Sequence, residues 1–311
     1  MNPFAELHPT IYRVLAGLIG LLVVITAMVA WRERGQSRNS ELWLRVTSWW
    51  TILTLFAGSI LLGIKGTLCL LGFVSFLALK EYFSLIPTRR SDRRVLFWAY
   101  LAIPLQYYWV YIGWFGMFLI FIPVYLFLLI PLRKVLIGET EGFLRSVGTI
   151  HWGLMITVFS LSHAGYLMVL PATVSPVGGA GLLLFLVVLT ELNDVMQYVW
   201  GKTLGRRKVA PMVSPGKTWG GLAGGIGTTM LLAWIAAPWL TPLNDTQALA
   251  AGLLIGMFGF IGDITLSAVK RDIGIKDSGQ LIPGHGGILD RVDSLTYTAP
   301  LFFHYLYFLH Y

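Results

Sequence analysis

Long apolar runs separated by short polar segments make up most of the chain. A helix of ~20 predominantly apolar residues is long enough to cross the hydrocarbon core of a bilayer. Candidate spans lie near residues 11–31, 47–64, 67–86, 95–112, 114–132, 148–170, 178–200, 219–240, 247–268 and 294–310. Tight turns at Lys65–Gly66 and at Gly113 join neighbouring spans, so nine or eleven spans also fit. The pattern predicts an all-α fold, a polytopic transmembrane helical bundle of about ten spans.

The composition supports this prediction. Hydrophobic residues make up 56% of the chain and charged residues 12%, and the mean hydropathy is +0.71. Soluble domains carry roughly 25% charged residues. So few charges cannot cover a water-facing surface, and we expect an integral, multi-pass membrane protein. Cys69 is the single cysteine, so a disulfide framework and a cysteine metal site are excluded.

The basic residues predict the orientation. The first span has only Arg13 near its start and is followed by Arg32, Arg34 and Arg38. This flank is the reverse of a signal peptide and indicates a retained span with the N-terminus outside. With ten alternating spans, the inner segments and Lys80 hold 21 of the 23 lysines and arginines. Such asymmetry is typical of cytoplasmic loops, so the net charge of +8 does not indicate a nucleic-acid partner.

Polar residues are distributed differently in the two halves of the chain. Before residue 175 the loops are mainly basic, as in 89–94. After it, polar groups lie at the inner ends of the spans: Glu191, Asn193, Asp194, Asp263, Asp290 and Asp293. Polar groups cost several kcal/mol in lipid and mark functional sites. We therefore expect residues 1–175 to form a scaffold, with lipid entry and oligomer contacts, and residues 176–311 to form the catalytic region.

The segment 262–271 concentrates the chemistry. On a helix, Asp263, Ser267, Lys270 and Arg271 recur at i, i+4, i+7 and i+8 and share one face. A carboxylate, a hydroxyl and two cations on one stripe suit a metal-bound polyphosphate. The alternative is that the two cations only anchor the helix end while Asp263 pairs with Lys270.

The following segment, 276–293, is typical of an anion-binding loop. It contains four glycines and a proline, which allow backbone N–H groups to approach an anion. Asp290 and Asp263, if brought together, would repel each other unless a cation lay between them. Mg²⁺ prefers oxygen ligands and often uses one or two carboxylates together with substrate phosphates. We therefore expect Mg²⁺ on Asp263 and Asp290, and a second cation stays open.

This region resembles the signature of the phosphatidate cytidylyltransferases (CDP-diglyceride synthases). Seventeen positions match over 27 residues without a gap: Ser267, Val269, Lys270, Arg271, Lys276, Asp277, Gly279, Ile282, Pro283, His285, Gly286, Gly287, Ile288, Asp290, Arg291, Val292 and Asp293. An upstream block of the same family resembles Asp194, Tyr198, Gly201, Gly205, Ser214, Pro215, Lys217 and Thr218. The resemblance covers about 194–293, and it departs from the family pattern at Gln197, Gly216 and Gly220.

The resemblance implies transfer of CMP from CTP to phosphatidic acid, giving CDP-diacylglycerol and pyrophosphate in phospholipid biosynthesis. Catalytic roles follow for Asp263, Lys270, Arg271, Asp290 and Arg291. Binding of substrate follows for Asp194, Tyr198, Ser214, Lys217, Thr218, Ser267, Lys276, Asp277, His285, Gly286, Gly287 and Asp293. CTP is cytoplasmic, so we expect the site at the cytoplasmic face of a bacterial inner (plasma) membrane, among membrane lipids. A homodimer stays open.

Three alternatives remain to be weighed. Gly216-Lys217-Thr218 is not a P-loop, because Pro211 stands where a glycine is needed and we expect no strand before it. A transporter would carry polar residues near the midplane of several spans, whereas here they gather at one face. A CTP-dependent lipid kinase of the dolichol kinase type would transfer the γ-phosphate and needs a base, for which Asp277 or Asp293 are candidates.

Overall fold

Helices cover each of the ten apolar runs in this computed structural model, which describes residues 7–33, 40–86, 92–138, 140–171, 177–279, 284 and 286–311. The elements in chain order are α1 (Pro9–Arg32), α2 (Glu41–Leu61), α3 (Gly63–Leu85), α4 (Asp92–Tyr111), α5 (Phe115–Ile120), the π-helix η1 (Phe121–Leu126), α6 (Phe127–Ile137), α7 (Phe143–Leu154), the π-helix η2 (Met155–Phe159), α8 (Ser160–Leu167), α9 (Gly179–Thr203), β1 (Lys208–Ala210), β2 (Ser214–Thr218), α10 (Trp219–Leu240), α11 (Asp245–Asp272), α12 (Leu289–Val292) and α13 (Leu295–His310). The all-α fold class is confirmed.

Seven of the described helical segments are long and apolar enough to cross a membrane: α1, α2, α3, α5 to α6, α9, α10 and α11. Their outward faces carry apolar side chains, such as Val24 and Leu128. Such faces are costly in water and suit lipid. The protein is an integral membrane protein, while the span count of about ten and the outer N-terminus stay predictions.

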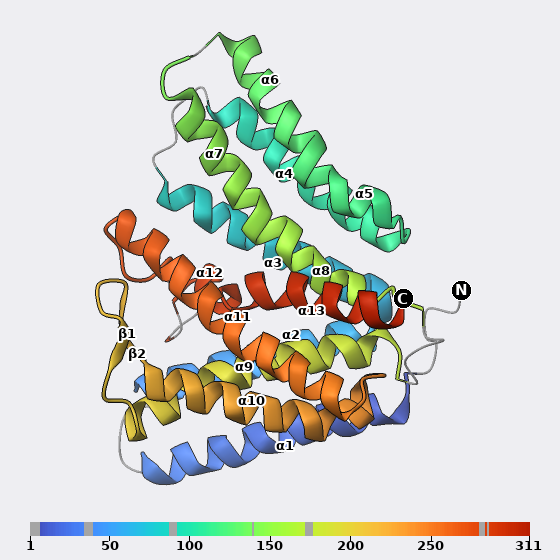
Figure 1. Cartoon of the computed structure of the whole chain (residues 1–311), viewed down its shortest axis with the longest axis vertical. Coiled ribbons are helices and arrows are strands. Elements are labelled where there is room, and N and C mark those ends of the chain that lie inside the picture. Colours follow the sequence, from blue (N-terminus) through green and yellow to red (C-terminus); the bar gives the residue numbers. More distant parts are fainter. Residues whose placement is uncertain are drawn as a thin grey trace.

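Several helices have one of their ends at the same side of the molecule. Helices α9, α10 and α11 pack against one another, and α13 packs against α11 and α8. The β1–β2 hairpin and the C-terminal end of α11 lie at one side of the molecule, whereas the start of α1 and the end of α13 lie at the opposite side (Figure 1). The polar residues of α9, α11 and the hairpin are thereby brought to the same side.

Buried polar contacts fix how α9, α10 and α11 pack. Asn193 Nδ2 on α9 donates to the carbonyl oxygen of Gly256 on α11 at 3.3 Å, and Thr229 Oγ1 on α10 donates to Asn193 Oδ1 at 3.1 Å. Small residues at this contact let the backbones approach closely, because a Cβ at Gly252 would lie 2.6 Å from Met230 Cα. A hydrogen-bonded polar group in such packing specifies one register of the helices.

The structure corrects one expectation about the segment before α10. Strands β1 and β2 pair antiparallel, with Lys208 opposite Thr218 and Ala210 opposite Ser214. The prediction that no strand precedes Gly216-Lys217-Thr218 is therefore wrong, since β1 lies before these residues and β2 begins at Ser214. Thr218 ends the strand and begins α10, where its Oγ1 accepts a hydrogen bond of 3.1 Å from the amide of Gly221.

Candidate active site

Four side chains from separate parts of the chain meet at the hairpin side of the bundle. We call Asp194 on α9, Lys217 on β2, Asp263 on α11 and Asp293 after α12 the Lys217 cluster. Lys217 Nζ lies 2.6 Å from Asp263 Oδ2 and donates a hydrogen bond of 3.1 Å to Gln197 Oε1. Asp194 and Asp293 are also close enough to interact electrostatically with Lys217.

Negative charge is in excess in the Lys217 cluster. Burial would lower the pKa of Lys217, but the carboxylates of Asp263, Asp194 and Asp293 outweigh burial and raise it. Burial, together with repulsion from Asp263 and Asp194, raises the pKa of Asp293 well above its ordinary value, although Lys270 opposes the rise. Three carboxyl groups are thus grouped around one lysine, an arrangement that favours a further positive charge.

Asp194 has an oxygen that the described protein leaves without a partner. Its Oδ2 accepts a hydrogen bond of 2.8 Å from Ser294 Oγ. Its Oδ1 is buried and has no hydrogen-bond partner among the described residues, although Arg291 interacts with Asp194 electrostatically. Buried carboxylate oxygens are rarely left unsatisfied, because their desolvation costs free energy. This oxygen is therefore available to a cation or a donor from a ligand.

Asp290 organises the loop that follows α11. Its Oδ1 lies 2.7 Å from Lys270 Nζ, and its Oδ2 accepts from the amides of Ser278 at 2.9 Å and Gly287 at 3.0 Å. Burial opposes ionisation, but these donors lower the pKa of Asp290 below its ordinary value. Gly286 has a φ of +80°, and a Cβ there would lie 2.6 Å from Asp290 Oδ2. Gly286 of the motif is thus required by its positive φ and by the close approach of this carboxylate.

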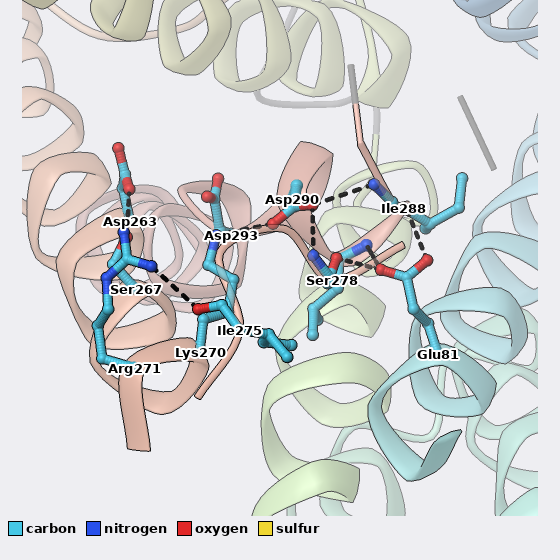
Figure 2. A network of polar contacts seen from close by, with 12 residues as sticks. Glu81, Asp263, Ser267, Lys270, Arg271, Ile275, Ser278, Ile288, Asp290 and Asp293 are labelled. Atoms are coloured by element: carbon cyan, nitrogen blue, oxygen red, sulfur yellow. Dashed lines mark hydrogen bonds and ion pairs between the residues drawn. The ribbon is translucent and has the colours of Figure 1, made fainter. Parts of the chain in front are cut away.

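Glu81 on α3 contacts the same loop from the other side and was missed from the sequence. Its Oε1 accepts from Ser278 Oγ and from the amide of Leu289 at 3.1 Å, and its Oε2 accepts from the amide of Ile288 at 2.9 Å. Figure 2 shows Ser278 between Glu81 and Asp290. A carboxylate within the run 67–86 was the available signal, since intramembrane carboxylates usually have a function.

Two of the other predicted residues, Ser267 and Arg271, lie on α11 C-terminal to Asp263. Ser267 Oγ donates to Asp263 Oδ1 at 3.2 Å. Arg271 links α11 to the hairpin, because its Nε donates to the carbonyl of Val213 at 3.2 Å and its Nη1 to that of Ile275 at 2.9 Å. The face shared by Asp263, Ser267 and Arg271 is thus continuous along α11.

Several predicted residues lie apart from the Lys217 cluster. Tyr198 is 64% exposed, and its ring faces Lys202 Nζ at 5.2 Å. Lys276 and Asp277 are exposed. Ser214 is opposite Ala210 in the hairpin. His285 lies outside the described residues.

Two of the three departures from the family pattern are close to Lys217. Gln197 accepts the hydrogen bond from Lys217. A Cβ at Gly216 would meet open space, so a side chain fits there. A Cβ at Gly220 would lie 2.9 Å from the carbonyl oxygen of Leu204, so a side chain there requires the backbone to shift.

The predicted metal pair is held by lysines in this structure. Asp263 pairs with Lys217 and Asp290 pairs with Lys270, so the alternative pairing of Asp263 with Lys270 is wrong. Within the described ranges, no group of three His, Cys, Asp or Glu side chains is arranged to hold a metal ion. Magnesium on Asp263 and Asp290 stays a prediction. The unpartnered Asp194 Oδ1 and the excess of carboxylates nevertheless fit a cation at the Lys217 cluster.

Comparison with known proteins identifies the family. The family model described as "Cytidylyltransferase family" matches residues 43–309. The chain belongs to the cytidylyltransferase family. It is therefore a nucleotidyltransferase, and the resemblance found in the motifs is confirmed. The match begins in α2, so it includes the helices from α2 onward, whereas α1 precedes it.

Named relatives share different parts of the chain. The uncharacterized protein YnbB of Escherichia coli is 50% identical over 295 residues, which cover 94% of this chain and 97% of YnbB. A phosphatidate cytidylyltransferase of Haemophilus influenzae is 43% identical over 141 residues, 44% of this chain and 49% of that enzyme. That of Synechocystis is 46% identical over 117 residues, 37% of this chain and 40% of the relative. The matches to enzymes of stated activity thus span less than half of each chain.

Proposed function

We propose that this protein is a CTP:phosphatidate cytidylyltransferase. The observation that carries the proposal is the Lys217 cluster beside the Lys270–Asp290 pair, where cations and buried carboxylates from α9, β2, α11 and the α12–α13 turn converge at one side of a membrane bundle. The named activity of the relatives in Haemophilus influenzae and Synechocystis supports the same substrate.

The reaction joins two anions and needs little proton transfer. A phosphate oxygen of phosphatidate bonds to the α-phosphorus of CTP, and the bond from that phosphorus to the bridging oxygen of the β-phosphate breaks, so that pyrophosphate leaves. The attacking phosphate is largely ionised at neutral pH, and a dedicated base is not required. The protein's task is to hold both anions and to stabilise charge on the leaving pyrophosphate.

The basic residues have separate roles in this proposal. Lys217 is charged and lies at the cluster, where it can move from Asp263 to a phosphate oxygen. Lys270 is held by Asp290 beside the glycine loop. Arg271 and Arg291 complete the positive charge around the phosphates. Lys217 is paired with Asp263 in the free protein. When the nucleotide binds, Lys217 exchanges this ion pair for one with a phosphate, so the cost of desolvating the lysine is limited.

Magnesium is proposed for the carboxylates of this site. We propose Asp263 as a metal ligand in every case. Asp290 is the second ligand proposed from the sequence. Asp290 already accepts from three N–H donors, whereas Asp194 has a free oxygen, so Asp194 and Asp293 are further proposed ligands. When bound, Mg²⁺ would neutralise the triphosphate and polarise the reacting phosphorus.

We further propose that the site faces the cytoplasm of a bacterial inner membrane and that lipid enters from the inner leaflet.

A product assay on the purified protein tests the proposal. Protein in mixed micelles with phosphatidate, CTP and Mg²⁺ should release pyrophosphate and form CDP-diacylglycerol, identified by mass spectrometry. Asp263→Asn protein of equal folded yield serves as the control and should form the product about 10² times more slowly. Absence of CDP-diacylglycerol with every phosphatidate species offered would contradict the proposal.

A further inference from the structure

The loop after α11 is held between two carboxylates that belong to different halves of the chain. Asp290 accepts from the amides of Ser278 and Gly287. Glu81, on α3, accepts from the hydroxyl of Ser278 and from the amides that follow Gly287. Every described amide from residue 287 to residue 289 therefore donates to one of these two carboxylates, and the loop position depends on both (Figure 2).

The glycines of this loop are packed directly against Glu81. A Cβ built at Gly287 would collide with the Glu81 carboxyl group, to which its three nearest atoms belong. A Cβ at Gly279 would lie 3.1 Å from Glu81 Oε2. Gly287 does not have a positive φ, so its backbone would accept an alanine. A side chain at Gly287 is excluded because the Glu81 carboxyl group occupies the space.

These contacts connect α3 to the proposed phosphate-binding cations. Glu81 fixes the amides of Ile288 and Leu289, which begin the turn that carries Asp290. Asp290 in turn holds Lys270 Nζ at 2.7 Å. Loss of the Glu81 contacts would release the turn, move Asp290 and change where Lys270 points. Hydrogen bonds to an ionised acceptor are roughly twice as strong as neutral ones, so this connection is stiff.

We propose that Glu81 is a positioning residue for cytidylyl transfer, which sets the glycine loop and, through Asp290, the ammonium group of Lys270. This proposal rests on the proposed function for its kinetic part. Glu81 does not act on the reacting atoms itself. Helix α3, from the half that we expected to provide the scaffold, lipid entry and oligomer contacts, thereby contributes to the active site.

The first experiment compares Glu81→Ala, Glu81→Gln and Glu81→Asp with Glu41→Ala in nanodiscs. Glu41 is a matched control, because its side chain is 72% exposed and pairs with Arg45 one helical turn away. Hydrogen–deuterium exchange should rise about tenfold or more at residues 276–279 and 286–289 in Glu81→Ala, since charge-assisted hydrogen bonds are lost. Glu81→Gln should be intermediate because it keeps one acceptor oxygen. Exchange equal to that of Glu41→Ala would overturn the proposal.

Kinetics separate positioning from a merely structural role. In Glu81→Ala, kcat per folded molecule should fall about tenfold or more, because Lys270 is misplaced at the transition state, and Glu81→Asp should recover part of it. A structural role would instead lower the folded yield and leave the kcat of folded protein unchanged, and that result would overturn the proposal. Wild-type protein without any CMP transfer would refute the proposed function, while the exchange measurement would still decide whether Glu81 holds the loop.

A double-mutant cycle tests the contact with Gly287. Gly287→Ala in the wild-type background should raise exchange of the loop and lower kcat, because its methyl group collides with the Glu81 carboxylate. In the Glu81→Ala background the same change should add little, since the colliding atoms are gone. Residues in contact give such non-additive effects, whereas independent sites add. Additive effects of the two changes would contradict the contact and with it the proposal.

Discussion

At the scale of single residues, the site is a set of carboxylates whose partners differ. Asp290 is saturated by a lysine and two amides, whereas Asp194 retains an unpartnered oxygen and Asp293 is surrounded by other carboxylates. Identical functional groups therefore have different chemical roles here. Asp290 holds the loop and Lys270, whereas we propose the Lys217 cluster as the place for a cation and phosphate.

Substitution of Asp263 in the Lys217 cluster should abolish most of the activity. Asp263→Asn is expected to lower kcat by about 10², because a charge contact of roughly 3 kcal/mol to the transition state is lost. Asp272→Asn, an exposed position at the end of α11, should be nearly neutral. Steady-state rates at saturating CTP measure both, and retained activity in Asp263→Asn would refute the metal role of this residue.

Opposite pH dependences should distinguish Asp293 from Asp290. The pKa of Asp293 is raised in the folded protein, so its ionised form destabilises the fold above that pKa and the effect is absent at low pH. Asp293→Asn should therefore raise Tm at pH 8, and the gain should shrink towards pH ~4. The pKa of Asp290 is lowered below its ordinary value, so Asp290→Asn should lower Tm at neutral pH, and the loss should shrink only as the pH falls below ~4. Thermal unfolding in detergent across this pH range gives both signs, and equal signs would contradict the assigned environments.

At the scale of elements, the hairpin and α3 are the parts that bring distant residues to the site. Apolar run length was enough to predict where helices lie, since lipid requires internally hydrogen-bonded segments. It could not predict β1 and β2, because both are short and β2 contains Pro215 and Gly216. It also could not pair Glu81 with Ile288, because nothing local in the sequence marks a contact between residues so far apart.

The candidate site was predictable to the extent that its residues share a helix or a motif. Asp263, Ser267 and Arg271 follow from helical periodicity on α11. The partners of Asp263 and Lys270 did not follow, because tertiary packing decides which lysine reaches which carboxylate. Glu81 fell in the scaffold half for the same reason. The division of the chain at residue 175 stays a prediction, and the contact between Glu81 and the loop after α11 joins its two sides.

The junction of hairpin and helix offers a stability test. Thr218 caps α10 through the amide of Gly221, and its Oγ1 lies 3.3 Å from the Cβ position of Gly201 on α9. Thr218→Ala should lower the free energy of unfolding by about 1 kcal/mol, as for other N-caps, while Thr218→Ser should retain most of it. The exposed Thr203→Ala is the control. Equal Tm values for all three variants would show that the cap contributes nothing.

At the scale of the whole molecule, the proposed topology places the Lys217 cluster on the cytoplasmic side. Helices α10 and α11 are joined at the side opposite to the hairpin, so Asn244 and Lys202 should lie on different sides of the membrane (Figure 1). In a Cys69→Ser background, a cysteine at Asn244 should react with an impermeant thiol reagent added to intact cells, and one at Lys202 should be shielded. The reverse labelling would place the cluster on the wrong side for CTP.

The most direct test of the central claim is the fate of the phosphates of CTP. Purified protein is supplied with phosphatidate, Mg²⁺ and CTP labelled with ³²P at either the α- or the γ-phosphate. Cytidylyl transfer predicts α-label in the lipid phase and γ-label in pyrophosphate, because the proposed attacking group is a phosphate that is already ionised and the cations of the site are proposed to stabilise the leaving pyrophosphate. A CTP-dependent kinase gives the reverse distribution. Finding γ-label in lipid, with phosphatidate inert and a polyprenol active, would contradict the account.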